Sequence, residues 1–315
     1  MIFVVTHMIP TDPATVMLGD KATPQVIRAF RQRWGLDRSV YEQYALYMRN
    51  LARGDLGVSI RSGQPVTADI ADHLPATVEL AVAAMLFSSI VGTSLGICAA
   101  LTRGRWLDGI IRLTSLAGVS APVFWTGVLL IVTLFYYLQW FPSGGRLSLT
   151  LEPPPHITGL YTVDSLLDGN WRLFIDSVKH LILPAISLGA YYMALFVRLA
   201  RSSLIEEFQT DYFRTARAKG LTTERVLVHH ALRNALVPII SYSGIAFGGL
   251  LSGAVVTETI FSWPGLGRYA FENALTFDFP AIMGVTLIIG LMYVAVNFMV
   301  DVLQVVADPR LRDTL

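Results

Sequence analysis

The sequence predicts an all-α membrane protein with several transmembrane helices, and three observations lead to this prediction. Of the 315 residues, 53% are hydrophobic and only 15% are charged, whereas about a quarter of the residues in soluble domains are charged. Five apolar stretches are long enough to cross a bilayer, whose core requires about 20 residues of helix because lipid offers the backbone no hydrogen-bond partner. Polar segments connect these stretches, which argues against the buried helices of a large soluble protein.

Each of the five stretches is expected to form a full transmembrane helix, and none has a Lys or Arg in its middle. They run approximately from Leu80 to Leu101, Leu113 to Leu138, Leu181 to Ala200, Val237 to Val256, and Ala281 to Val305. Residues 1–10 are apolar but too short to cross a bilayer, and Pro10 and Pro13 stop a helix there. We interpret residues 1–10 as the remnant of a truncated first transmembrane helix.

The basic residues of the short connections predict the orientation of the chain. Lys and Arg concentrate between the first and second full spans and in the segment 201–236, so the positive-inside rule assigns both connections to the cytoplasm. This orientation makes residues 11–76 an external segment and residues 306–315 a cytoplasmic tail, on either side of a core formed by residues 77–305.

Two external segments differ in their expected structure. Helical periodicity around residues 26–34 and 41–51 predicts two helices within the first of them. The second, residues 139–180, contains three consecutive prolines, Pro153 to Pro155, and is expected to be an irregular loop.

Glycine pairs spaced four residues apart predict close packing of the spanning helices. The pairs are Gly92 with Gly96, Gly244 with Gly248, and Gly249 with Gly253. This spacing allows two helix backbones to approach each other closely. We therefore expect an interface within the chain or with a second subunit, and the ordinary abundance of glycine in membrane helices is the alternative explanation.

The segment 201–236 is too polar to span a membrane and too long to be a simple turn. A first helix is expected from Asp211 to Lys219, ending at Gly220, because glycine readily adopts the positive φ that terminates helices. Thr222 can cap a second helix that leads into the next span.

The first helix of this segment is expected to be amphipathic and basic. Tyr212, Phe213 and Ala216 can share one face, with Arg214 and Arg217 on another. Such a helix can bind a partner protein or lie against anionic lipid, and its composition alone does not separate the two.

Several motifs follow one another in an order that resembles a known family. The first is the run Tyr212, Phe213, Arg214, Thr215, Ala216, Arg217, Ala218, Lys219, Gly220, followed by residues 230–238. The second, an external loop motif before the last span, consists of Glu258, Phe261, Pro264, Gly265, Leu266 and Gly267. Residues 10–14, 54–59 and 74–77 supply further motifs. Together they resemble permease subunits of ABC importers of the dipeptide, oligopeptide and nickel branch, over nearly the whole chain.

The resemblance implies a type I ABC importer transmembrane-domain fold, with five full transmembrane helices and a truncated first one. It implies that residues 201–236 form a cytoplasmic coupling loop whose helix, Tyr212 to Gly220, contacts cytoplasmic ABC ATPase subunits. The implied partners also include a second homologous permease, an external substrate-binding protein and the lipid bilayer of the prokaryotic inner membrane. ATP and Mg are expected on the partner ATPases, and no cofactor on this chain. Short peptides are the favoured substrate, but nickel, glutathione and sugar oligomers remain open.

The sequence lacks the residues that several other functions require. A phosphate-binding loop requires a Lys followed by Ser or Thr, but Lys21, Lys179 and Lys219 precede Ala, His and Gly. ATP hydrolysis by this chain is therefore not expected. The net charge of +1 argues against nucleic-acid binding, and the single cysteine, Cys98, argues against a disulfide or a cysteine-based metal site. A secondary transporter or channel, and less so an intramembrane enzyme, remain alternatives that predict ionisable or nucleophilic groups at membrane depth.

Overall fold

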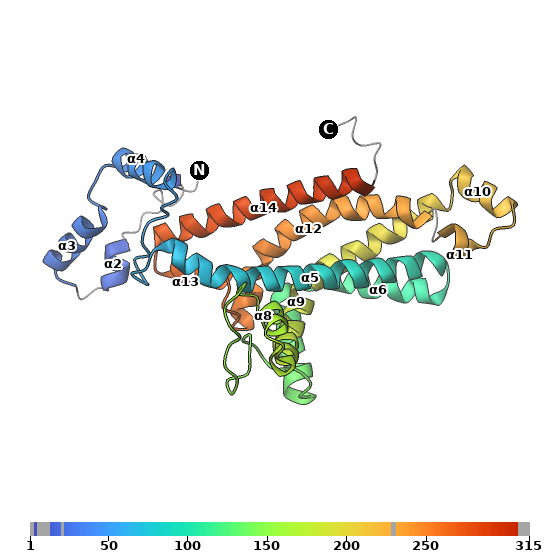
Figure 1. Ribbon diagram of the computed structural model, residues 1–315, viewed down its shortest axis with the longest axis horizontal. Coiled ribbons are helices and arrows are strands. Elements are labelled where there is room, and N and C mark those ends of the chain that lie inside the picture. The colour runs from blue at the N-terminus through green and yellow to red at the C-terminus, as the bar shows by residue number, and fades with distance from the viewer. Residues whose placement is uncertain (1–2, 5–12, 20–21, 228–230, 308–315) are drawn as a thin grey trace. The chain divides into compact units, whose positions relative to one another are not determined.

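The computed structural model describes residues 3–4, 13–19, 22–227 and 231–307, and this part of the chain is helical, as predicted (Figure 1). Within these residues the β contact is an isolated antiparallel bridge between Val58 and Pro65. The chain forms two compact units. The first unit comprises Met1–Thr77 and Pro264–Leu291, and the second comprises Val78–Trp263 and Met292–Leu315.

The first unit contains short helices and the ends of two long ones. Its elements are α2 (Pro13–Leu18), α3 (Pro24–Trp34), α4 (Val40–Leu51), the first turns of α5 (Val66–Leu101), α13 (Leu266–Leu275) and the start of α14 (Phe279–Ala307). Helices α3 and α4 confirm the periodicity-based prediction. Ser39 begins α4 with a capping box, because its hydroxyl accepts from the Glu42 N–H while the Glu42 carboxylate accepts from the Ser39 N–H.

The second unit is built around one long helix, α9 (Trp171–Glu207). This helix contacts α6 (Trp106–Ser120), α7 (Val123–Leu130), α8 (Tyr161–Leu167) and α12 (Leu232–Ile260). Two short helices, α10 (Asp211–Ala218) and α11 (Thr223–Val226), lie beyond the end of α9, between α9 and α12 in the chain (Figure 1).

The candidate spans agree with the predicted ones, and the second of them is bent. Over the described residues, α5, α9, α12 and α14 are long and apolar enough to cross a membrane. The predicted span from Leu113 to Leu138 corresponds to a bent pair of helices, because α6 and the continuous pair α7 and π-helical η1 (Ile131–Tyr137) meet at an angle of 108° and pass as an apolar span only together. The helix breaks at Ala121, whose ψ is 125°, since the following Pro122 disfavours helical backbone before it and lacks an N–H.

The segment 139–180 is less irregular than its prolines predict. It contains α8, and α9 already begins at Trp171, where the Asn170 side chain accepts a hydrogen bond from the Leu173 N–H at 3.2 Å. The prediction missed residues 171–180 of α9 because hydropathy reports where a helix enters lipid and not where the helix begins. Apart from Phe3 and Val4, the proposed remnant of a first span, residues 1–10, lies outside the described residues, as does the tail from residue 308 onward.

Candidate functional site

Helix α10 is the predicted first helix of the segment 201–236. It spans Asp211–Ala218, and Gly220 adopts a φ of +86°, so the predicted helix and its glycine terminus are both confirmed. The Gly220 N–H donates to the Arg217 carbonyl at 2.9 Å, and the Leu221 N–H donates to the Ala216 carbonyl at 3.2 Å. These bonds satisfy carbonyls that a helix end leaves unpaired, so the corner after α10 is ordered by backbone geometry.

One face of α10 is anchored in a hydrophobic cluster that we call the loop core. Phe213, which is 8% exposed, is the residue of α10 buried in it, Ala216 packs against it, and the rings of Phe208 and Phe213 lie 5.0 Å apart. The buried residues of the loop core are Ala100, Leu204, Phe213, Val226, Leu227, Ala231 and Ala235. They come from the end of α5, the end of α9, the segment around α11 and the beginning of α12. The loop core therefore packs α10 against the ends of three candidate spanning helices at once.

Tyr212, which the sequence put on one face with Phe213 and Ala216, does not enter the loop core with them. Its side chain is partly exposed, and its hydroxyl donates to the Glu207 carboxylate at the end of α9, with the Asn234 amide nitrogen 3.5 Å away. Burial raises the pKa of the Tyr212 hydroxyl, and the Glu207 carboxylate raises it further. The hydroxyl therefore stays protonated at neutral pH and ties α10 to α9 as a hydrogen-bond donor.

The opposite face of α10 is open to solvent and carries a net positive charge. Its exposed residues are Asp211, Arg214, Thr215, Arg217 and Ala218, and the exposed Lys219 and Gly220 follow directly after the helix. Arg214 and Asp211 lie 3.6 Å apart with highly exposed side chains, so their pairing contributes little. Arg217 donates to the Leu221 carbonyl at 2.9 Å and braces the corner. This face offers positive charge on a rigidly anchored helix.

An ion pair that the sequence did not predict joins α6 to α9. Arg201 donates to both carboxylate oxygens of Asp108, through Nε at 2.7 Å and Nη2 at 2.9 Å, and the Gly104 N–H also donates to this carboxylate at 3.2 Å. Bidentate hydrogen bonds between an arginine and a carboxylate are strong and directional. The partners are 93 residues apart in sequence, so no local signal revealed them.

The glycines of α5 lie against the backbone of α9. A Cβ atom added to Gly92 would lie 2.6 Å from the Met193 carbonyl oxygen, and one added to Gly96 would lie 2.6 Å from the Val197 carbonyl oxygen. Real Cβ atoms do not approach backbone so closely. At both positions the absence of a side chain lets the two helices touch.

The four glycines of α12 divide between two neighbours. Gly244 and Gly248 face Asn297 and Tyr293 of α14, and a Cβ atom at Gly244 would lie 2.8 Å from the Asn297 Oδ1. Gly249 faces Tyr192 of α9, and Gly253 faces Leu188 of the same helix at 3.2 Å. The structure thus puts all six predicted packing glycines at helix contacts within the second unit.

The external loop motif is divided between the two units. In the second unit, Glu258 and Phe261 are completely buried, and the Phe261 carbonyl accepts from the Gly145 N–H at 2.8 Å. In the first unit, Gly265 is the residue before α13, Pro264 is exposed, and Leu266 and Gly267 are buried. The Leu266 N–H donates to the Thr77 hydroxyl at 2.7 Å. The motif thus consists mainly of structural contacts in each unit.

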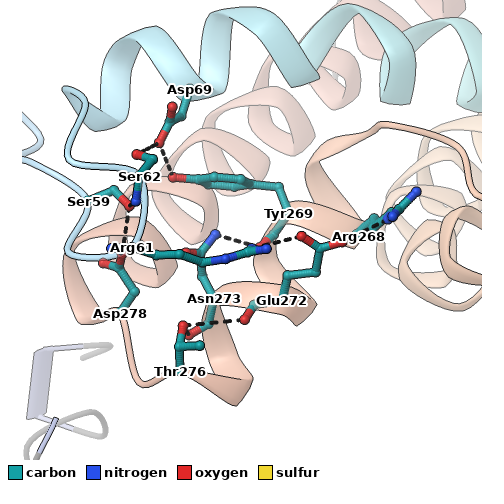
Figure 2. Close-up of polar contacts among 10 residues, drawn as sticks. All are labelled: Ser59, Arg61, Ser62, Asp69, Arg268, Tyr269, Glu272, Asn273, Thr276 and Asp278. Atoms are coloured by element: carbon teal, nitrogen blue, oxygen red, sulfur yellow. Dashed lines mark hydrogen bonds and ion pairs between the residues drawn. The ribbon is translucent and has the colours of Figure 1, made fainter. Parts of the chain in front are cut away.

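A polar network fixes the turn around residues 58–65 to α13 within the first unit, and Figure 2 shows its members. Asp278 accepts from the Ser59 hydroxyl at 2.7 Å and from the Arg61 N–H at 2.9 Å. Glu272 pairs with Arg61 at 2.7 Å. The Tyr269 hydroxyl donates to Asp69 at 2.8 Å, and burial followed by this bond raises the pKa of Tyr269.

Comparisons with known proteins identify the family of this chain. Residues 92–313 match the family described as binding-protein-dependent transport system inner membrane component, and residues 1–81 match the N-terminal family of the same system. The probable D,D-dipeptide transport system permease protein DdpB of Escherichia coli K12 is 44% identical, over 98% of this chain and 91% of the relative. The di/tripeptide transport system permease protein DppB of Pseudomonas aeruginosa is 43% identical, over 98% and 92%. The glutathione transport system permease protein GsiC of E. coli O6:H1 is 36% identical, over 99% and 92%.

Proposed function

Because this chain belongs to the family of binding-protein-dependent transport system inner membrane components, we propose that it moves di- or oligopeptides and that α10 couples it to cytoplasmic ATPases. The chain is a multi-pass inner membrane protein and the pore-forming permease subunit of an ABC importer, and its relatives are transporters and not enzymes.

The substrate proposal rests on the relatives. The names of the two most similar relatives given above specify D,D-dipeptides and di- or tripeptides, and the third specifies glutathione. All three substrates are small peptides with free ionised groups. A short peptide is therefore the substrate class that we propose for this chain.

The proposed partners follow from the type of transporter. A second homologous permease completes the pore, cytoplasmic ABC ATPases bind ATP and Mg, and an external binding protein delivers the peptide. In this arrangement residues 11–76 are external, residues 77–305 form the permease core with 201–236 as its cytoplasmic coupling loop, and the tail from residue 306 is cytoplasmic.

The coupling proposal rests on one observation, the two different faces of α10. Its exposed face, with Arg214, Arg217 and Lys219, offers a basic surface to an ATPase, while Phe213 is anchored in the loop core. A push on the exposed face is therefore passed to the ends of α5, α9 and α12 and not dissipated in a flexible loop. A secondary transporter has no need for such an element.

Gly220→Val tests this proposal. Valine at a φ of +86° costs about 1–2 kcal/mol and distorts the corner after α10. Gly104→Val is the matched control, since Gly104 has a φ of +78° and, like Gly220, nothing within 4 Å of an added Cβ atom. In the reconstituted transporter we expect at least tenfold lower ATP-dependent dipeptide uptake for Gly220→Val and near-normal uptake for the control. Normal uptake by an inserted Gly220→Val protein would refute the proposal.

A crosslinking experiment tests directly whether α10 contacts the ATPase. In a Cys98→Ser background, Ala218→Cys puts a thiol on the exposed face of α10, and Leu149→Cys puts one on a fully exposed position of the expected external loop. Ala218→Cys should crosslink to the ATPase and resist an external, membrane-impermeant thiol reagent. Leu149→Cys should react with that reagent and should not crosslink to the ATPase. If Ala218→Cys reacts from outside and Leu149→Cys is protected, the assigned orientation is wrong.

A further inference from the structure

A groove between α6 and α9 carries both positive charge and apolar surface. Its volume is about 480 Å³, and it lies within the second unit. Three arginines line it, Arg112 from α6 and Arg198 and Arg201 from α9. Leu113, Leu116 and Val119 form much of the apolar wall. The groove is thus amphipathic, which is unusual for a surface that only faces hydrocarbon.

The positive charge of the groove exceeds the negative charge beside it. Arg201 is bound through two hydrogen bonds to Asp108, so this arginine is neutralised within the protein. The side chains of Arg112 and Arg198 are exposed. Two guanidinium groups are therefore left in excess, and guanidinium binds phosphate oxygens through paired, charge-assisted hydrogen bonds.

The groove also lies where lipid headgroups are expected. The apolar helix α5 ends at Leu101 and is followed by Arg103, and α6 begins with Trp106, which is 75% exposed. Tryptophan and arginine at the end of spanning helices mark the bilayer interface. From this level the exposed side chains of Leu113 (68%) and Leu116 (64%) continue along α6.

We propose that this groove binds one anionic phospholipid. Arg112 and Arg198 hold the phosphate, and an acyl chain lies along Leu113 and Leu116. Free phosphate fits only the charged part of the groove, and a zwitterionic lipid does not use the second positive charge. The positive-inside rule assigns this end of α6 to the cytoplasmic leaflet, where anionic lipids attract basic residues. The proposal is independent of the transported substrate and of the role of α10.

Native mass spectrometry of the full chain in detergent tests the proposal. The probes are phosphatidylglycerol, phosphatidylcholine and inorganic phosphate, each titrated separately and in competition. We expect one phosphatidylglycerol to bind at a concentration at which phosphatidylcholine does not. The double variant Arg112→Gln, Arg198→Gln should lower the affinity for phosphatidylglycerol at least tenfold.

The double variant Arg103→Gln, Arg105→Gln is the matched control, because it removes the same charge from exposed positions in the neighbouring turn. Its affinity should stay within twofold of that of the unaltered protein. An equal loss in both double variants, equal binding of phosphatidylcholine, or displacement of the lipid by inorganic phosphate would each overturn the proposal.

A photo-crosslinking residue at Leu116 distinguishes a lipid from a protein neighbour. In the assembled transporter it should capture phospholipid. Capture of a second permease chain would mean that a subunit covers the groove, and the lipid assignment would then be wrong.

Discussion

Arg146 and Glu79 form a buried ion pair, with 2.6 Å between Nη2 of the arginine and Oε2 of the glutamate. Their side chains are only 7% and 4% exposed. The Arg146 guanidinium also lies 3.7 Å from the ring centre of Tyr161, and Glu79 accepts hydrogen bonds from the Thr162 N–H and hydroxyl. One charge pair thus holds the segment 139–160 and the start of α8 against α5.

Removing one partner of this pair should destabilise the protein strongly. Glu79→Ala leaves the Arg146 charge buried without its counter-ion, and such a change costs about 3–5 kcal/mol. The measurement is thermal unfolding in detergent. Glu152→Ala, at an exposed position of the same loop, is the control and should change stability by less than about 0.5 kcal/mol. Equal melting temperatures for the two variants would contradict the role given to the pair.

Gly92→Ala should destabilise the contact between α5 and α9. The added methyl group would lie 2.6 Å from the Met193 carbonyl oxygen and from the Phe196 Cβ, so the helices must separate, at a cost of about 1–3 kcal/mol. Gly290→Ala in α14 is the matched control, since nothing lies within 4 Å of its Cβ position. Alanine is the better helix former, so this control should be neutral or stabilising by about 1 kcal/mol. A neutral Gly92→Ala would mean that the two helices are not closely packed.

Ionised Asp164 should stabilise the folded protein, and this stabilisation should be lost in acid. Burial alone raises the pKa of this carboxyl, but hydrogen bonds from Thr158 and from the N–H groups of Gly159 and Ile157 outweigh burial and lower the pKa below its ordinary value. The unfolded chain therefore takes up the proton first as pH falls. The stabilisation is complete above the ordinary pKa and is lost as pH falls through the lower, folded value.

The measurement is the melting temperature between about pH 7 and pH 3. Asp164→Asn should cost about 1–3 kcal/mol at pH 7, because the charged acceptor is lost, and should flatten the decline in acid. Asp168→Asn, at the exposed C-cap of the same helix, is the control and should leave the acid decline unchanged. A decline as steep in Asp164→Asn as in the unaltered protein would exclude Asp164 as its source.

The features that the sequence predicted correctly are determined by residues close together in the chain. Four of the spans follow from apolar length, because lipid imposes a minimum on every helix that crosses it. The end of α10 at Gly220 follows from the backbone freedom of glycine. The sequence missed the break at Ala121 because the run from Leu113 to Leu138 is apolar on both sides of it, so hydropathy alone does not distinguish a straight span from a bent pair.

Two ion pairs of the second unit, one bidentate and one buried, join residues far apart in the chain, and this explains why the sequence did not predict them. Asp108 pairs with Arg201 across 93 residues and Glu79 with Arg146 across 67. Helical spacing puts Tyr212 on one face with Phe213 and Ala216, whereas its hydroxyl bonds to Glu207 on the preceding helix. Helical periodicity gives the direction of a side chain but not the partner that its polar end meets.

Phe213→Ala should uncouple transport from ATP hydrolysis while leaving ATPase binding intact. The variant loses most of the side chain that α10 buries in the loop core, but the exposed Arg214 and Lys219 remain available to a partner. A loosened α10 then moves without carrying α5, α9 and α12 with it. We expect the ATPase to co-purify normally and the peptide transported per ATP hydrolysed to fall at least fivefold.

Two variants of the same helix separate transmission from docking. Thr215→Ala changes an exposed, uncharged position and should retain normal coupling. Arg214→Glu reverses a charge on the exposed face and should weaken ATPase co-purification, while the Phe213 anchor stays in place. If the ATPase no longer co-purifies with Phe213→Ala, the loop core is also needed to keep α10 in the conformation that binds the ATPase. If Phe213→Ala couples normally, the loop core does not transmit force, and the movement must reach the spanning helices by another contact.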